Sequence, residues 1–130
     1  MSDSRFVHVI LPIGFDPLFP ARRAAIEQGV SRSGLKPRFP DYARDKPEFD
    51  LAELKLSLQM AERVVADLSH ERPSCYYELG VAEAMGKRVV LIAEAGTPIH
   101  QSSVRNAIEY YYSIHEISDI VADILRVHAQ

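Results

Sequence analysis

The chain has 130 residues, of which 47% are hydrophobic and 25% are charged, proportions typical of one globular domain with a core of its own. Its formal net charge of -3 excludes the diffuse positive field that binds a nucleic-acid polymer, so we expect no such partner. Cys75 is the only cysteine, which excludes an intrachain disulfide and a cysteine-rich zinc site and fits a reducing compartment.

The longest apolar stretches are too short to span a membrane. Phe6 to Pro12 and Val89 to Ala93 fall well below the roughly 20 residues that a membrane helix requires. Residues 1–5 lack the charged and apolar regions of a signal peptide. We therefore expect a soluble, cytoplasmic protein without a membrane partner.

Strands and helices are expected to alternate along the first half of the chain. The β-branched run at 6–11 predicts a buried strand, and helical spacing of apolar residues predicts a helix from about 20 to 33. Residues 36–39 can form a short second strand, and a polar loop over 40–47 leads to a second helix over 49–63. The apolar face of that helix comprises Leu51, Leu54, Leu58 and Ala61.

The same alternation continues in the second half. Its expected elements are a strand over 64–68, a helix from the N-cap Ser74 to Gly86, a strand over 88–93, a helix over 102–109, a strand over 111–114 and a helix over 117–128.

Such alternation predicts parallel pairing through right-handed crossovers. Residues 1–130 are therefore expected to form one α/β domain, a flavodoxin-like three-layer α/β/α sandwich with a five-stranded parallel sheet in the order 2-1-3-4-5. Ligands bind such sheets beyond the carboxyl ends of the strands, at the point where the strand order reverses. Here that point lies between the first and third strands, so residues 12–19 and 67–78 are expected to border the ligand site.

Glu78 is the leading candidate for chemistry. Its helical neighbours Val81, Ala82 and Met85 are apolar, so we expect a partly desolvated carboxylate with a raised pKa, suited to nucleophilic or acid–base work. The alternative is a carboxylate that complements the helix dipole in the first turn, for roughly 0.3–1 kcal/mol. Gly80 costs about 1 kcal/mol relative to alanine inside a helix, which favours close packing or ligand approach there.

Asp67 ends the third predicted strand, facing the same edge of the sheet. It could bind a ribose hydroxyl or assist proton transfer, or it could cap the loop that follows. Tyr76 and Tyr77 flank Glu78, where one ring could stack on a base or pack in the core. Cys75 has no nucleophilic context and is expected to be a small packing residue.

The loop after the first strand offers a weak phosphate site. Gly14 allows backbone amides to approach a phosphate or ribose, although no complete G-x-G-x-x-G or P-loop pattern is present. Arg22 and Arg23 could pair with a phosphate or form a solvated helix surface. The five histidines show no metal-ligand spacing, so neither a metal nor a cofactor is expected.

Four segments carry a resemblance to a known family. The runs VVADLS at 64–69, RPSCYYELG at 72–80 and AEAMGKRVVLI at 82–92, with the opening VHVILPIGFD at 7–16, resemble the nucleoside 2-deoxyribosyltransferase-like superfamily, in its bacterial branch related to TIR-like domains. The resemblance implies that Glu78 attacks the anomeric carbon of a nucleoside or nucleotide. It also implies a second catalytic carboxylate at Asp67.

The expected ligand is a small nucleoside, nucleotide or NAD. The residues expected to bind it are Pro12, Ile13, Gly14, Phe15, Asp41, Ser69, Arg72, Ser74 and Tyr77, of which Asp41 falls near an acidic position of the family.

Departures from the family pattern favour a hydrolase over a transferase. Arg72 stands where transferases carry an aspartate and related hydrolases a serine, and residues 117–130 do not match the asparagine that transferases contribute to a neighbouring subunit. An arginine there could bind a phosphate through its forked donor, or simply pair with Glu71 or Asp67 at the surface.

Two alternative functions remain. The pattern from Cys75 to Leu79 also resembles TIR domains that cleave NAD, and a third possibility is a nucleotide-binding or signalling module without turnover.

A homo-oligomer, most simply a dimer, is also expected. Tyr110, Tyr111 and Tyr112 present more aromatic area than a short edge strand easily hides, and tyrosine is enriched at interfaces. Strand alternation would bury Tyr111 and leave its neighbours on the other face.

Overall fold

The computed structural model describes residues 5–12, 16–39, 50–100 and 108–128, and its centre is a parallel sheet. The strands are β1 (Phe6–Ile10), β2 (Lys36–Arg38), β3 (Arg63–Asp67), β4 (Val89–Glu94) and β5 (Ile108–Tyr111). They pair in the order β2-β1-β3-β4-β5, which confirms the predicted order.

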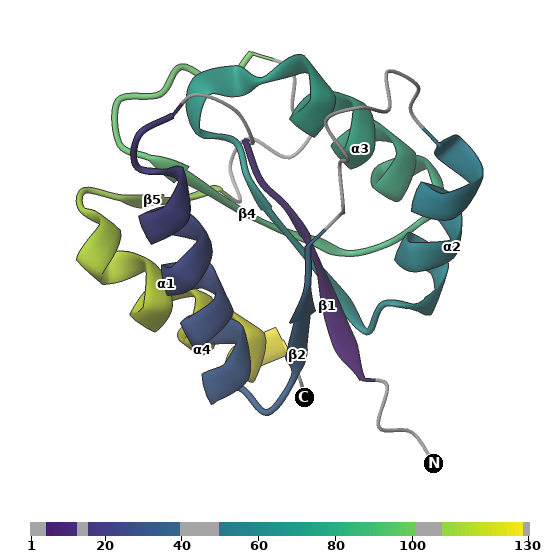
Figure 1. Ribbon diagram of the computed structural model, residues 1–130, viewed down its shortest axis with the longest axis horizontal. Helices are drawn as coiled ribbons and strands as arrows, with labels where there is room; N and C mark the ends of the chain where they lie inside the picture. The colour runs from purple at the N-terminus through teal and green to yellow at the C-terminus, as the bar shows by residue number, and fades with distance from the viewer. Residues whose placement is uncertain (1–4, 13–15, 40–49, 101–107, 129–130) are drawn as a thin grey trace.

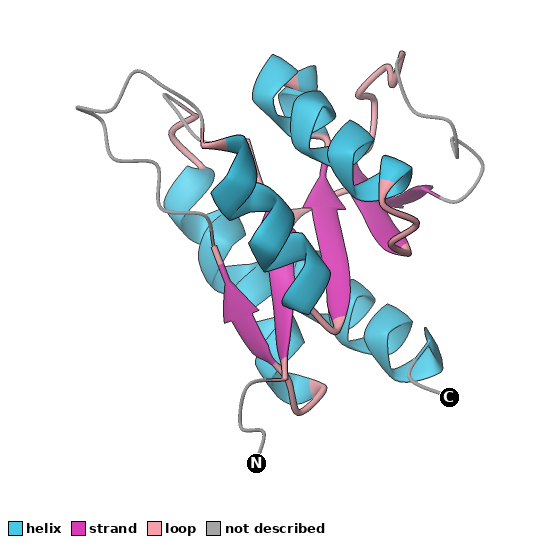
Figure 2. Cartoon of the chain, turned by 90° about the vertical axis from the view of Figure 1, so that its right-hand side faces the viewer, coloured by secondary structure: helices cyan, strands magenta, loops and turns pink. Residues whose placement is uncertain are grey.

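Helices cover both faces of this sheet, as Figures 1 and 2 show. They are α1 (Phe19–Arg32), α2 (Leu51–Met60), α3 (Pro73–Ala84) and α4 (Ile117–His128), with short 3-10 turns at η1 (Ser69–Glu71) and η3 (Ile114–Glu116). The helices α1 and α4 lie on one face, and α2 and α3 lie on the other (Figure 1). None of the helices in the described ranges is both long and apolar enough to cross a membrane.

The strand β1 is buried along its whole length because helices cover both of its faces. Val7 and Val9 belong to the core beneath α1 and α4. Ile10 belongs to the core beneath α2 and α3. Alternation along the strand places His8 on the same face as Ile10, so a titratable ring enters the layer between the sheet and the second pair of helices.

The start of the third helix differs from the prediction. Ser74 was expected to be the N-cap, but α3 begins at Pro73 and its N-cap is Arg72. Proline is favoured at the first helical position because its missing N–H would have no partner within the helix. Glu78 is consequently the sixth residue of α3 and lies beyond the first turn.

The fifth strand also lies earlier than predicted. It spans Ile108–Tyr111 and pairs in parallel with β4, so Ile108 and Glu109 are extended where the sequence predicted the end of a helix. The rest of that predicted helix, residues 102–107, lies outside the described residues. Pairing with β4 decides the position of this strand, and the local hydrophobic pattern does not reveal that pairing.

The second helix is shorter than predicted. Leu54 and Leu58 are buried as expected, but Leu51 is 42% exposed because the helix begins at this residue. Asp50 is its N-cap, and the side-chain oxygen accepts a hydrogen bond from the backbone N–H of Glu53 at 3.0 Å.

The tyrosine cluster alternates as predicted. Tyr111 is 1% exposed, whereas Tyr110 and Tyr112 are 42% and 81% exposed. The homodimer inferred from this cluster stays a prediction.

Replacing either of two glycines by alanine is expected to change the free energy of unfolding, in opposite directions. A Cβ at Gly29 in α1 would lie 2.8 Å from both the Ser118 carbonyl oxygen and Val121 Cβ of α4, whereas a Cβ at Gly80 in α3 would have no neighbour within 4 Å. We expect Gly29→Ala to lower the free energy of unfolding by about 1–3 kcal/mol through overpacking. Gly80→Ala should raise it by roughly 0.5–1 kcal/mol through helix propensity. Urea denaturation of both variants measures the difference, and equal effects would contradict the close approach of α1 and α4.

Candidate functional site

Glu78 is buried between α3 and the sheet. Its side chain is 3% exposed, and its neighbours Cys75, Leu79 and Ala82 are buried with it. Burial raises the pKa of the carboxyl group above its ordinary value, which confirms the desolvation expected from its apolar surroundings. The helix dipole does not explain the residue, because its effect falls off within the first turn.

The strand β1 presents His8 to this carboxylate. His8 Nε2 lies 3.5 Å from Glu78 Oε1, and both side chains are almost fully buried. Neither of these two atoms makes a hydrogen bond within the described part of the chain. His8 acts to lower the pKa of Glu78, but burial outweighs that effect.

The other ring nitrogen of His8 is anchored on α2. His8 Nδ1 lies 2.8 Å from Ser57 Oγ, so one hydrogen bond and one ion pair connect α2, β1 and α3. His8 pairs with Val64 in the middle of the sheet, and two further residues of β1 lie between it and the carboxyl end of the strand. Glu78 therefore faces the middle of β1 and lies deeper than the expected place at the edge of the sheet.

Asp67 belongs to a different cluster. It is fully buried at the end of β3, where Oδ1 accepts a hydrogen bond from the Ser69 backbone N–H at 2.9 Å and Oδ2 accepts one from the Tyr111 hydroxyl at 2.8 Å. Burial raises its pKa although these bonds oppose the shift. The bond to Ser69 is the loop-capping arrangement that the sequence left open as the alternative role.

The sheet separates the two acidic candidates. Asp67 bonds to Tyr111, whose ring packs in the core beneath α1 and α4, whereas Glu78 contacts His8 beneath α2 and α3. The structure thus brings Glu78 together with His8 and Ser57, and Asp67 together with Ser69 and Tyr111. A direct catalytic role for Asp67 stays a prediction.

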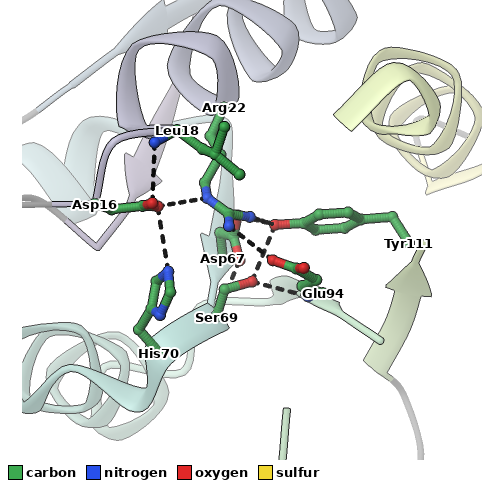
Figure 3. Close-up of polar contacts among 8 residues, drawn as sticks. All are labelled: Asp16, Leu18, Arg22, Asp67, Ser69, His70, Glu94 and Tyr111. Carbon is green, nitrogen blue, oxygen red and sulfur yellow. Dashed lines mark hydrogen bonds and ion pairs between the residues drawn. The ribbon is translucent and has the colours of Figure 1, made fainter. Parts of the chain in front are cut away.

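Arg22 lies at the centre of the cluster that contains Asp67 (Figure 3). The Arg22 side chain is 1% exposed. Its Nε donates to Asp16 Oδ2 at 2.7 Å, and one Nη donates to Glu94 Oε1 at 2.7 Å. The other Nη donates to the Tyr111 hydroxyl. Burial opposes the charge on Arg22, but the bonds to Glu94 and Asp16 outweigh burial and raise its pKa. The expected role of Arg22 as a solvated surface residue is therefore wrong, and its expected role as a phosphate ligand stays a prediction.

The backbone next to this cluster is strained. His70 and Glu71 have φ angles of 69° and 46°, in the left-handed region that is costly for residues other than glycine. His70 Nε2 lies 3.2 Å from Asp16 Oδ2, while Glu71 accepts hydrogen bonds from the Tyr76 hydroxyl and the His100 backbone N–H. These contacts hold the turn between β3 and α3 at the carboxyl edge of the sheet.

The remaining expected site residues differ in their burial. Pro12 and Ser69 are buried, Arg72 is half-buried, Ser74 is exposed and Tyr77 is 50% exposed. Ile13, Gly14, Phe15 and Asp41 lie outside the described residues. Burial raises the pKa of Cys75 to about 12, which fits the packing role expected for it.

Sequence reasoning missed the functional potential of His8 and the burial of Arg22. The signal for Arg22 was present, since it precedes Ile26 and Val30 by one and two helical turns and so shares their buried face. His8 lies within an apolar run, where the alternation of side chains along a strand does not show which residue the imidazole contacts. Within the described residues no cluster of three or more His, Cys, Asp or Glu side chains could hold a metal ion.

Loss of the Arg22 guanidinium is expected to destabilise the fold strongly. Arg22→Ala leaves Asp16 and Glu94 without their cation, so the free energy of unfolding should fall by about 3 kcal/mol. Arg23→Ala is the matched control, because Arg23 is exposed and stacks on the Phe39 ring at 4.2 Å, and it should cost less than about 1 kcal/mol. Chemical denaturation that gave equal losses would contradict the buried role of Arg22.

Glu78 should make stability depend on pH in a defined direction. Because the folded chain raises the Glu78 pKa above 4.5, ionisation of this group costs stability as the pH rises from about 4.5 through the folded value. Glu78→Gln removes that cost, so its melting temperature should exceed that of the wild type at pH 8 and approach it near pH 4. A difference that shrinks as the pH rises would contradict the burial of Glu78.

Comparison with solved structures identifies the architecture. A flavodoxin-like domain from Synechococcus sp. superposes with a TM-score of 0.65 at 14% identity, covering 95% of this chain and 98% of that one. A diflavin flavoprotein A3 from Nostoc sp. gives a TM-score of 0.60 at 12% identity over 95% of this chain and 91% of the other. Constitutive lysine decarboxylase from E. coli gives 0.53 at 10% identity, and there the match covers 92% of this chain but 16% of the decarboxylase.

These identities are too low to carry an activity from one protein to another, and they establish the arrangement of strands and helices alone. No protein-family model and no curated protein sequence matches the chain. Together with the observed strand order, the solved structures show that the chain has the α/β flavodoxin-like fold.

Proposed function

We propose that the protein cleaves the N-glycosidic bond of a nucleoside, a nucleotide or NAD, with Glu78 as the nucleophile. The observation that carries the proposal is the Glu78 carboxylate itself, which is buried while its Oε1 makes no hydrogen bond to any described residue. Leaving a buried acceptor unpaired costs stability, typically about 1–3 kcal/mol. Such costs concentrate at functional sites, where a reactive group is kept free for its substrate.

The chemistry follows from the position of the carboxylate. Oε1 attacks the anomeric carbon of the sugar, the bond from that carbon to the base nitrogen breaks, and the base leaves with the electron pair and takes up a proton. The resulting glycosyl ester is then hydrolysed by water, which releases the sugar and regenerates the carboxylate. Because Asp67 is bonded to Ser69 and Tyr111, the proposal assigns bond cleavage to Glu78 without it.

Reaction at Glu78 requires that ligand binding expose the carboxylate. Its side chain is 3% exposed in the structure, whereas the outer face of the same helix presents Tyr77 and Gly80 to solvent. Substrate binding must therefore be coupled to a movement of the surroundings of α3, as is common for enzymes that exclude water from the reacting atoms.

A second function is favoured by that same burial. A nucleotide-binding module without turnover needs no access to Glu78, and it would retain the carboxyl edge of the sheet as its binding surface. The residues of that edge in the described ranges include Pro12, Ser69 and His70.

Turnover of a ligand panel tests the proposal. We expect chromatography to detect free base from at least one nucleoside, nucleoside 5'-monophosphate or NAD, and Glu78→Gln to lower the rate by at least about a hundredfold because it lacks the nucleophile. Glu83→Gln, in the same helix, should retain the rate. A flavin belongs in the panel for the binding measurement alone, because one of the similar structures is a diflavin flavoprotein.

The outcomes separate the candidate functions. Base release that persists undiminished in Glu78→Gln would refute the assigned nucleophile. An absence of turnover together with a higher melting temperature in the presence of one panel member would favour the binding module.

A further inference from the structure

The buried pair of His8 and Glu78 consists of two polar atoms that face each other without a hydrogen bond. His8 Nε2 and Glu78 Oε1 are 3.5 Å apart, and neither has a hydrogen-bond partner within the described part of the chain. A pair that served packing alone would be expected to close this gap, since buried polar groups are normally satisfied. The gap leaves Oε1 free while His8 Nε2 faces it.

Ser57 determines which nitrogen of His8 can carry that proton. Its hydroxyl lies 2.8 Å from Nδ1, and when the hydroxyl donates, the proton of neutral imidazole must be on Nε2. When the ring is doubly protonated, Nδ1–H donates to the hydroxyl and Nε2–H still faces Glu78. In both of these states a donor points at the carboxylate, whereas a neutral ring protonated on Nδ1 would donate to the Ser57 hydroxyl and leave Nε2 without a proton.

No other described group competes for this carboxylate. Among the described residues, Ser57 of α2 is hydrogen-bonded to His8, Val64 pairs with His8 in the sheet, and Cys75 and Leu79 are buried on α3 with Glu78. Apart from the pair itself, Cys75 is the only titratable side chain among these, and burial keeps its thiol protonated at neutral pH. Within the described residues, His8 is the one group whose interaction with Glu78 favours the ionised form of the carboxyl group.

We propose that His8 is the positioning residue for Glu78, and that Ser57 orients its imidazole so that Nε2–H keeps the buried carboxylate ionised and fixed in place. This role rests on the proposed function in one respect, because it assumes that Glu78 is the nucleophile. It then explains how a buried glutamate remains one. A carboxylate that accepted a proton on burial would lose its nucleophilic lone pair. The imidazole offsets that tendency without occupying Oε1 at hydrogen-bonding distance.

Spectroscopy of the intact protein tests the role independently of turnover. In the wild type, ¹⁵N shifts of His8 should report the tautomer protonated on Nε2 at pH values where the ring is neutral; the tautomer protonated on Nδ1 would overturn the proposal. With ¹³C-labelled glutamate, the Glu78 carboxyl signal is assigned by its absence in Glu78→Gln. Its titration should move to higher pH in His8→Gln and, by a smaller amount, in Ser57→Ala.

Kinetics provide the second measurement. If the wild type releases base, the acid limb of the pH profile of kcat/KM should move to higher pH by about one pH unit or more in His8→Gln, because the carboxylate loses the imidazole that favours its ionised form. His115→Gln is the matched control, since His115 is exposed in η3, and it should move neither the titration nor the limb. A Glu78 titration that is the same in His8→Gln and the wild type would overturn the proposal.

Failure of the proposed function and failure of the role proposed for His8 give different results. A wild type without turnover refutes the proposed function, while the carboxyl titration and the His8 tautomer still decide the role of His8. If His8→Gln does not fold, Ser57→Ala and the wild-type tautomer give the answer.

Discussion

The buried guanidinium of Arg22 holds together segments of the chain that are far apart in sequence. It bonds to Asp16 ahead of α1, to Glu94 at the end of β4 and to Tyr111 at the end of β5, and the Tyr111 hydroxyl continues the network to Asp67 at the end of β3. A charge removed from water is tolerated only when its donors are satisfied, so these partners must stay in place together. The carboxyl ends of three strands are thereby fixed relative to α1.

The buried carboxylates on the two faces of the sheet differ in their hydrogen bonding. On the face of α1 and α4, Asp67 has a partner for each carboxylate oxygen, and its surroundings form a continuous bonded network. On the face of α2 and α3, Glu78 has an oxygen without a hydrogen bond and a single imidazole opposite it. The first arrangement stabilises the edge of the sheet, and the second leaves a buried acceptor unpaired at a cost in stability.

The sequence predicted what depends on local pattern. The β-branched runs located β1 and β3, the alternation of elements gave the strand order, and the apolar neighbours of Glu78 predicted its burial. It did not predict two of the partners of Arg22, Glu94 and Tyr111, which lie 72 and 89 positions away. Nor did it predict the contact between His8 and Glu78, because both depend on which faces meet across the sheet. The position of β5 was wrong for the same reason, since its pairing with β4 outweighs the local preference.

The long sequence separation of the Arg22 contacts has a consequence for the order of folding. Arg22 is synthesised 72 residues before Glu94 and 89 residues before Tyr111, and until both are available its guanidinium cannot be buried with its donors satisfied. Closing loops of this length requires a loss of chain entropy before any contact is gained, which slows folding. The carboxyl edge should therefore form late as the chain leaves the ribosome, after the pairing of β1 with β3.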